Sequence, residues 1–157
     1  MNLLSSFKKI FILGIGGSGM SSIAKYLKQK GHDVEGYDQR ISYITNLLES
    51  DGVKTCQNLD NFKYQEEVLY VISSAINLED TFLANYTENE NVISRPKFLE
   101  LLSEEVEILG ITGTHGKTST TALVSHIFHF NNKNASFIYG GVSGFGNLGG
   151  HFGEKTQ

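Results

Sequence analysis

A glycine-rich stretch, Gly110 to Thr121, constrains this chain most strongly, because it joins an apolar, strand-like run to a helix-like run. A turn of this kind exposes consecutive backbone N–H groups, and those around Gly113 and Gly116 can turn inward on an anion. Lys117 can then reach the outer phosphates of a nucleotide, and the Thr118 hydroxyl can ligand Mg2+. The stretch therefore predicts a binding site for a nucleoside triphosphate.

This stretch departs by one position from the standard phosphate-loop pattern, G-x-x-x-x-G-K-[ST]. The residue five places before Gly116 is Ile111, and the neighbouring glycines are Gly110 and Gly113. A glycine-rich turn with an incidental lysine is therefore the alternative interpretation. The run Gly-Lys-Thr between a strand-like and a helix-like segment favours the phosphate site.

A second glycine loop lies near the N-terminus. The apolar run Lys9–Ile15 predicts a strand that is covered on both faces, and the loop from Gly14 to Gly19 follows it. A strand at Asp33–Asp38 ends in an acid nineteen residues beyond Gly19. Between the loop and this strand, an amphipathic helix is predicted by an apolar stripe at Met20, Ile23, Ala24 and Leu27, with Gly31 at its end.

This order of elements is the dinucleotide-binding fingerprint, in which a diphosphate lies at the helix N-terminus. The Asp38 carboxylate can accept hydrogen bonds from ribose hydroxyls, but the pattern suits NAD, FAD and nucleotide sugars alike. A tight strand-to-helix turn without a ligand is the alternative for the glycines, and a strand-end turn residue is the alternative for Asp38. The candidate diphosphate-binding residues are Gly14, Gly16, Gly17, Ser18 and Gly19.

Two serines follow the next buried strand, which is predicted at Val68–Ile72. Ser73 and Ser74 lie at the carboxyl end of that strand, where open α/β sheets bind their ligands, so their hydroxyls could contact phosphate. In the alternative interpretation, they cap a helix that starts near Leu78.

The remaining patterns complete one small α/β domain and begin another. We expect a Rossmann-like parallel-sheet domain at residues 1–103, followed by the beginning of a P-loop α/β domain at 104–157. The second domain should start with a strand at Val106–Ile111, and the apolar stripe of its helix after the phosphate loop should lack much of its packing. Further elements are expected at Ile44–Ser50 (helix), Val53–Cys56 (strand), Asn91–Ser94 (strand), from Pro96 (helix) and at Ala135–Tyr139 (strand), with a loop from Gly140 to Gly153.

Composition excludes several classes of partner. The formal charge is -4 at pH 7 and lysine and arginine form no cluster, so neither nucleic acid nor an acidic membrane surface is expected. The apolar run near the N-terminus is too short for a signal-peptide core or a membrane span. The single cysteine, Cys56, suits a reducing compartment, and we therefore expect a cytoplasmic protein.

Three motifs together resemble the Mur ligase family. They are Gly14-Ile-Gly-Gly-Ser-Gly-Met20, Ser73-Ser-Ala-Ile76 and Gly113-Thr-His-Gly-Lys-Thr118, in this order and spacing. The similarity covers nearly all of the chain, to about Gly141. The first loop is typical of the family member that adds alanine, whereas the second is shared across the family.

The resemblance implies an ATP-dependent, amide-forming ligase of peptidoglycan precursor synthesis. In such ligases the carboxylate of UDP-N-acetylmuramate attacks the γ-phosphate of ATP, and the amine of L-alanine then displaces phosphate. The implied UDP-sugar site comprises Gly14, Gly16, Gly17, Ser18, Gly19, Asp38, Ser73 and Ser74. The implied ATP site comprises Gly113, Thr114, His115, Gly116, Lys117, Thr118 and Ser119, with Lys117 and Thr118 catalytic and Thr118 as the Mg2+ ligand.

Other interpretations stay open within and outside the family. Gly140-Gly-Val-Ser143 looks more like the member that attaches a recycled peptide to UDP-N-acetylmuramate, and Tyr37 precedes Asp38 where a small residue is expected. The first domain taken alone would also suit an NAD(P)-binding oxidoreductase. Because family members have three domains, we expect the chain to be a fragment that binds its ligands without turnover.

Overall fold

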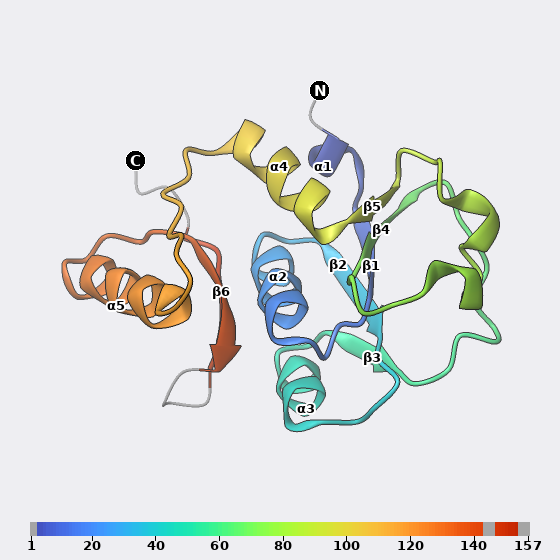
Figure 1. Cartoon of the computed structure of the whole chain (residues 1–157), viewed down its shortest axis with the longest axis horizontal. Coiled ribbons are helices and arrows are strands. Elements are labelled where there is room, and N and C mark those ends of the chain that lie inside the picture. The colour runs from blue at the N-terminus through green and yellow to red at the C-terminus, as the bar shows by residue number, and fades with distance from the viewer. Residues whose placement is uncertain (1–2, 143–146, 154–157) are drawn as a thin grey trace.

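The computed structural model describes residues 3–142 and 147–153, and its larger part is a five-stranded parallel sheet (Figure 1). The strand order is β3-β2-β1-β4-β5, with all strands parallel. Successive strands are added on one side of β1 up to β3 and then on its other side from β4, so the order reverses between β1 and β4. Sheets of this order bind their ligands at that reversal. The strands are β1 (Lys9–Leu13), β2 (Asp33–Tyr37), β3 (Lys54–Cys56), β4 (Val68–Ile72) and β5 (Val92–Ser94). The predicted Rossmann-like α/β fold is confirmed.

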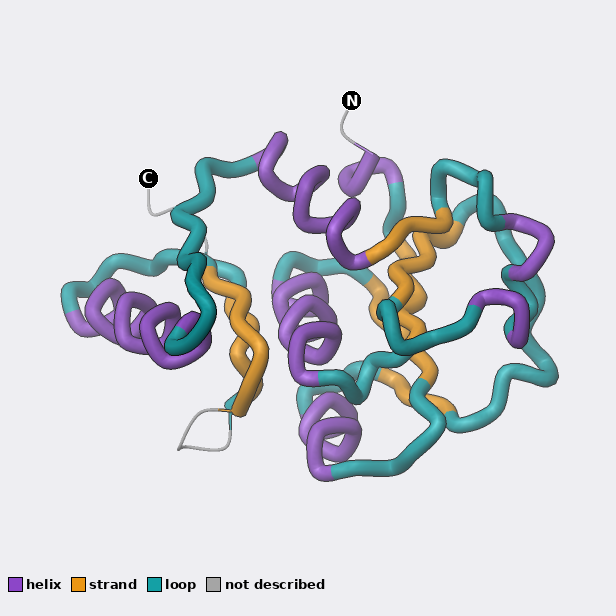
Figure 2. The backbone as a smooth tube through the Cα atoms, in the orientation of Figure 1, coloured by secondary structure: helices purple, strands orange, loops and turns teal. Residues whose placement is uncertain are grey.

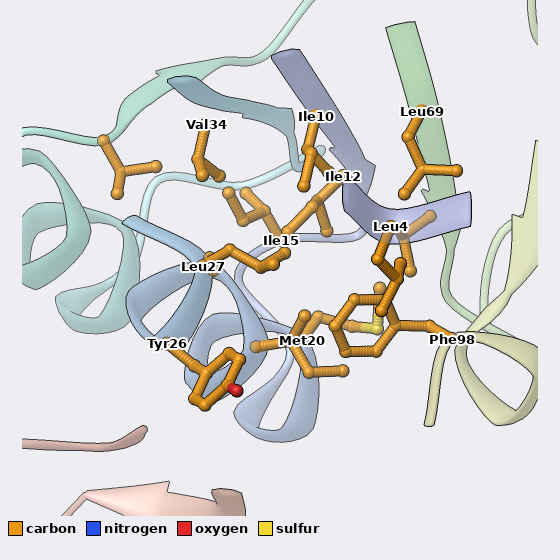
Figure 3. Packing of buried hydrophobic residues seen from close by; sticks show 14 of the residues in the cluster. Leu4, Ile10, Ile12, Ile15, Met20, Tyr26, Leu27, Val34, Leu69 and Phe98 are labelled. Atoms are coloured by element: carbon orange, nitrogen blue, oxygen red, sulfur yellow. The ribbon is translucent and has the colours of Figure 1, made fainter. Parts of the chain in front are cut away.

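The central strands β1 and β4 are covered on both faces, as their apolar sequences predict. Ile10 and Ile12 of β1 belong to the core cluster on the helix side, whereas Phe11 and Leu13 belong to the cluster on the opposite face. This alternation follows from the two-residue period of a strand. Figure 3 shows Ile10, Ile12 and Leu69 packed against the helix layer.

One face of the sheet is covered by the helices α1 (Leu3–Ser6), α2 (Ser18–Gln29), α3 (Tyr43–Ser50) and α4 (Arg95–Glu105) (Figure 2). Local sequence signals set where these helices begin. Ser42 and Thr45 form a capping box at the start of α3, in which each side chain bonds to the backbone amide of the other residue. Ser94 caps α4, and Pro96 lies in its first turn as predicted.

The opposite face is covered by loops and by two short 3-10 helices, η1 (Leu78–Asp80) and η2 (Ala84–Tyr86). Aromatic side chains fill the space that a helix layer would occupy. The ring of Phe11 lies 4.9 Å from that of Phe62 and 6.1 Å from that of Phe82, measured between centroids. Edge and tilted contacts of this kind stabilise beyond the area that they bury, so this face is a second core rather than an open surface.

The C-terminal part of the chain contains α5 (Lys117–Phe130) and an antiparallel pair of strands, β6 (Phe137–Val142) and β7 (Leu148–His151). The strand predicted at Val106–Ile111 is wrong, because this segment is irregular and Leu109 is 71% exposed. A strand needs a neighbour for its backbone N–H and C=O groups, and none lies beside this segment in the described residues. The domain boundary at residue 103 stays a prediction. It lies within α4, which continues to Glu105.

The loop predicted from Gly140 to Gly153 is also wrong, since it contains the end of β6 and all of β7. Residues 143–146 of that prediction lie outside the described residues. Seven glycines hide the apolar alternation by which a strand is recognised. They also permit unusually close packing, because a Cβ atom on Gly149 would overlap the carbonyl group of Tyr139.

The β6–β7 pair packs against α2 on the side away from the large sheet (Figure 2). The Ser22 hydroxyl donates to the Tyr139 carbonyl oxygen at 2.6 Å, and a Cβ atom on Gly150 would overlap the Ser22 backbone. The rings of Tyr26 and Phe152 meet edge to face at 5.5 Å between centroids. Helix α2 therefore joins the two parts of the chain.

Helix α5 is held much less firmly. Leu123 is 64% exposed, Ile127 58% and Phe128 41%, whereas Val124 is half-buried, so the expectation that the apolar stripe lacks much of its packing is confirmed. In the parts of the chain that the structure describes, no helix is both long and apolar enough to span a bilayer.

The packing of β7 on α2 predicts that Gly150→Ala loosens the C-terminal part of the chain. The added methyl group would overlap the Ser22 backbone, and overpacking of this kind costs about 1–3 kcal/mol. Hydrogen–deuterium exchange should become faster in β6, β7 and the outer face of α2. Gly110→Ala is the matched control, because no atom lies within 4 Å of its Cβ position. Equal exchange in the two variants would contradict the packing.

Candidate functional site

The first glycine loop lies where β1 ends, at the reversal of strand order. The amides of Gly14 and Ile15 both donate to the carbonyl oxygen of Tyr37 at the end of β2, at 2.7 and 3.0 Å. Gly14 has a φ of +79°, and a Cβ atom on it would lie 2.7 Å from the Cβ atom of Ser73 at the end of β4. Only glycine fits this position, which fixes the loop over the carboxyl ends of three neighbouring strands.

Asp38 lies directly beside this loop. Its Oδ2 accepts a hydrogen bond from the Gly16 amide at 2.8 Å, and its Oδ1 accepts one from the Arg40 amide at 3.2 Å. A Cβ atom on Gly16 would lie only 2.8 Å from Oδ2, so this glycine is needed for the contact. The carboxylate fixes the loop, and the ribose contact predicted for Asp38 would use lone pairs that these amides leave free.

Gly17 and Ser18 form the exposed tip of the loop. Gly17 has φ -66° and ψ 140°, an extended conformation that any residue adopts. A Cβ atom on it would lie 3.3 Å from the Gly14 carbonyl oxygen, which is tight but requires only a small adjustment. The fold therefore has little need of a glycine here. Close approach of a ligand to the backbone is a physical reason for one.

The two serines after β4 differ in position. Ser73 is half-buried against Gly14, and its hydroxyl oxygen accepts weakly from the Ala75 amide at 3.4 Å, whereas Ser74 is exposed. The alternative in which these serines cap the next helix is wrong, because the cap of η1 is the side chain of Asn77. Ser73 thus belongs to the wall of the first loop, and the phosphate contacts of both serines stay predictions.

The second glycine loop ends at α5, whose N-cap is Gly116. Gly113 has a φ of +146° and Gly116 a φ of +79°, so both positions require glycine. The first turn of α5 carries no acidic residue and no side-chain cap, which leaves its amides available to an anion. The backbone here has the chemistry that was predicted for a phosphate loop.

Lys117 lies over this loop, since its Nζ donates to the carbonyl oxygens of Gly113 and Thr114. Residues 114–119 are all exposed, which leaves the loop open to a ligand. The described residues hold no cluster of three or more histidine, cysteine or acidic side chains that could bind a metal ion. The Mg2+ contact of Thr118 stays a prediction, and an ion held there by one protein oxygen would take its other ligands from phosphate and water. The roles of His115 and Ser119 stay predictions.

Strand β6 brings the two loops together. A Cβ atom on Gly140 would lie 3.3 Å from Ser18 Oγ, and one on Gly141 would lie 3.4 Å from Thr118 Cγ2. This glycine pair therefore lies between the first turn of α2 and the first turn of α5. Both helix N-termini carry partial positive charge, so two anionic groups can bind close to one another across the pair.

Sequence reasoning missed two features of this site. The linking position of Gly140 and Gly141 depends on a packing contact that no local pattern reveals. Arg95, at the start of α4, places its guanidinium group against Gly19 of the first loop. Its position just after β5, at the carboxyl edge of the sheet, is the sequence signal that could have identified it.

Comparison with known proteins gives a consistent set of relatives. The signature described as "Mur ligase family, catalytic domain" matches residues 9–107. The UDP-N-acetylmuramate--L-alanine ligase of Cytophaga hutchinsonii is 32% identical over 147 residues, which cover 89% of this chain and 32% of that protein. The enzyme with the same name from Hydrogenobaculum sp. is 36% identical over 137 residues, covering 87% of this chain and 30% of that protein. The chain spans about a third of the length of these relatives.

Solved structures agree with this assignment. The UDP-N-acetylmuramate-alanine ligase of Thermotoga maritima superimposes with a TM-score of 0.75 at 28% identity, covering 92% of this chain and 34% of that one. The UDP-N-acetylmuramate:L-alanyl-gamma-D-glutamyl-meso-diaminopimelate ligase of Neisseria meningitides gives a TM-score of 0.75 at 26% identity, covering 93% of this chain and 47% of that one. The signature, the sequence relatives and the fold agree, and the chain belongs to the Mur ligase family.

Proposed function

We propose that this chain supplies the UDP-sugar site and the phosphate loop of an ATP-dependent ligase that joins L-alanine to UDP-N-acetylmuramate in peptidoglycan precursor synthesis. The observation that carries the proposal is the contact of both loops with Gly140 and Gly141. An acyl phosphate forms only if a carboxylate of one ligand reaches the γ-phosphate of the other, so their anion sites must adjoin. The names of the sequence relatives support the choice of substrates.

Each loop has a distinct role in this proposal. The amides at the start of α2 bind the UDP diphosphate, and Ser73 and Ser74 contact its phosphate groups. The Asp38 carboxylate accepts hydrogen bonds from the ribose hydroxyls. At the second loop, Lys117 exchanges its loop carbonyls for the β- and γ-phosphates of ATP, with Gly113 and Gly116 allowing close backbone approach. Mg2+ held at Thr118 supplies charge neutralisation of the phosphates.

Catalysis in this scheme rests on positioning and on charge, because phosphoryl transfer asks little covalent chemistry of the protein. Thr114, His115 and Ser119 line the same loop and complete the ATP site. We propose a cytoplasmic location, because the proposed ligands occur in the cytoplasm and a single cysteine is consistent with a reducing compartment.

One alternative within the family has its own support. The ligase from Neisseria meningitides, whose name includes a peptide, has the same TM-score as the alanine ligase from Thermotoga maritima. Both names contain UDP-N-acetylmuramate, so the first loop would have the same role in either case. The alternative of an NAD(P)-dependent oxidoreductase does not agree with the family assignment, and it would leave the loop from Gly113 to Thr118 without a function.

Thermal unfolding in the presence of separate ligands tests the proposal. UDP-N-acetylmuramate, UDP and ATP with Mg2+ should each stabilise the chain, since a ligand at a hundred times its dissociation constant adds about 2.7 kcal/mol. UDP and ATP should stabilise additively if they occupy the two loops. Stabilisation by NAD with none by UDP would contradict the assignment of the first loop.

At the first loop, Gly17→Ala should weaken UDP binding by about tenfold or more, because the methyl group occupies the exposed face that a diphosphate would approach. The free energy of unfolding should change by less than about 1 kcal/mol, since φ is -66° at this residue. Calorimetric titration with UDP and chemical denaturation measure the two effects. Gly110→Ala is the matched control, and equal UDP affinity in both variants would exclude Gly17 from the diphosphate site.

At the second loop, Lys117→Ala should remove the stabilisation by ATP and leave that by UDP unchanged. The lysine supplies the only side-chain positive charge in the loop from Gly113 to Ser119, whereas the UDP site uses other elements. Lys133→Ala, which removes an exposed lysine just beyond α5, is the control. If Lys117→Ala abolished both responses, the two nucleotides would share a single site.

A further inference from the structure

Arg95 reaches from the sheet edge to the first glycine loop. It is the first residue of α4 and directly follows β5, yet its guanidinium group lies against Gly19 in the first turn of α2. A Cβ atom on Gly19 would lie 2.7 Å from Arg95 Cζ, 2.8 Å from Nη2 and 3.1 Å from Nε. The glycine at this position therefore makes room for the guanidinium group.

Among the described residues, the Nε–H group of Arg95 has no hydrogen-bond acceptor. Arg95 Nε is buried and makes no hydrogen bond, and no carboxylate in the described parts of the chain forms an ion pair with Arg95. Arginine keeps its charge at any physiological pH, so it cannot avoid the cost by losing a proton. A buried donor without a partner destabilises a fold, which points to a partner that binds from outside.

The surroundings add to this positive charge. Helix α2 begins without a side-chain cap and without an acid in its first turn, and the amides of Ser18 and Gly19 have no acceptor within the helix. The carboxylate of Asp38 bonds to the amides of Gly16 and Arg40 instead. The positive charge of a guanidinium group is repelled by the partial positive charge of a helix N-terminus. A polyanion that binds to both groups makes their proximity favourable.

We propose that Arg95 binds the diphosphate of the nucleotide in the first loop, together with the amides at the start of α2. This inference rests on the proposed function of that loop and adds a residue to it. The planar fork of a guanidinium group can donate to two phosphate oxygens at once, in addition to the bonds that the loop amides donate. Arg95 thereby adds to the preference for nucleoside diphosphates over nucleosides.

The first experiment compares Arg95→Gln with Lys97→Gln by calorimetric titration of UDP at constant ionic strength. Both changes remove one positive charge from the first turn of α4, but Lys97 is exposed and pairs with Glu100. UDP affinity should fall about 10- to 100-fold in Arg95→Gln and change by less than about twofold in Lys97→Gln. Arg95→Lys should fall between the parent and Arg95→Gln, because it keeps the charge without the fork.

Uridine separates a charge effect from a change in loop structure. Its affinity should be the same in the parent and in Arg95→Gln, since it carries no phosphate. Equal UDP affinities of the parent protein and Arg95→Gln would overturn the role of Arg95 and leave the proposed function intact. An equal loss of UDP and uridine binding would also overturn it, since Arg95 would then only support the loop. A parent that binds no UDP would overturn the proposed function as well.

A measurement on the unchanged protein covers the case in which Arg95→Gln does not fold. The sequence contains two arginines, Arg40 and Arg95, so a nitrogen–proton spectrum of the side-chain Nε–H groups should hold two signals, assigned with Arg40→Lys. UDP should shift the Arg95 signal and slow its exchange with water, while uridine should leave it in place. An Arg95 signal that does not respond to saturating UDP would overturn the proposal.

Discussion

The structure depends on the close approach of α2 to strands on both of its sides. One face of the helix packs through Ile23 and Leu27 on the parallel sheet, and the other packs through Ser22 on β6 and β7. Small residues make the second contact possible, because a Cβ atom on Gly150 would overlap the helix backbone. A helix that is packed on both faces has a fixed position, so its N-terminus is a fixed anion site.

This double packing also explains how two loops distant in the sequence come to share one surface. The contact that holds β6 on α2 places Gly140 beside Ser18, and the next residue of the same strand lies beside Thr118. A Cβ atom on Gly140 would lie 3.3 Å from Ser18 Oγ and one on Gly141 would lie 3.4 Å from Thr118 Cγ2, so strand β6 is in close reach of both helix N-termini. Gly141 also has a φ of +154°, which favours glycine. The proposed reaction needs this proximity, since the ligands themselves carry the reacting groups.

Much of the fold could be predicted from the sequence, because the apolar residues in the first part of the chain follow the patterns of buried strands and amphipathic helices. Continuous apolar runs identified β1 and β4, and the 3.6-residue stripe identified α2. The errors arose where pairing or packing decides the structure. Strand β7 has glycines in place of an apolar pattern, and Val106 to Ile111 has the pattern but no neighbouring strand among the described residues. The conformations of Gly113 and Gly116 were predictable, because a phosphate loop requires them, but the contacts of Arg95 and Asp38 join residues far apart in the sequence.

The glycine fingerprint itself has several physical causes. Gly14 is needed for its positive φ and its contact with Ser73, Gly16 for Asp38 and Gly19 for Arg95. Three of the four glycines therefore accommodate parts of the protein. Only Gly17, exposed and in an ordinary conformation, is left to be explained by a ligand. Because the glycines mainly shape the loop, part of the affinity for a diphosphate must come from side chains that other elements bring to it, and Arg95 from the far edge of the sheet is the side chain that we propose for this role.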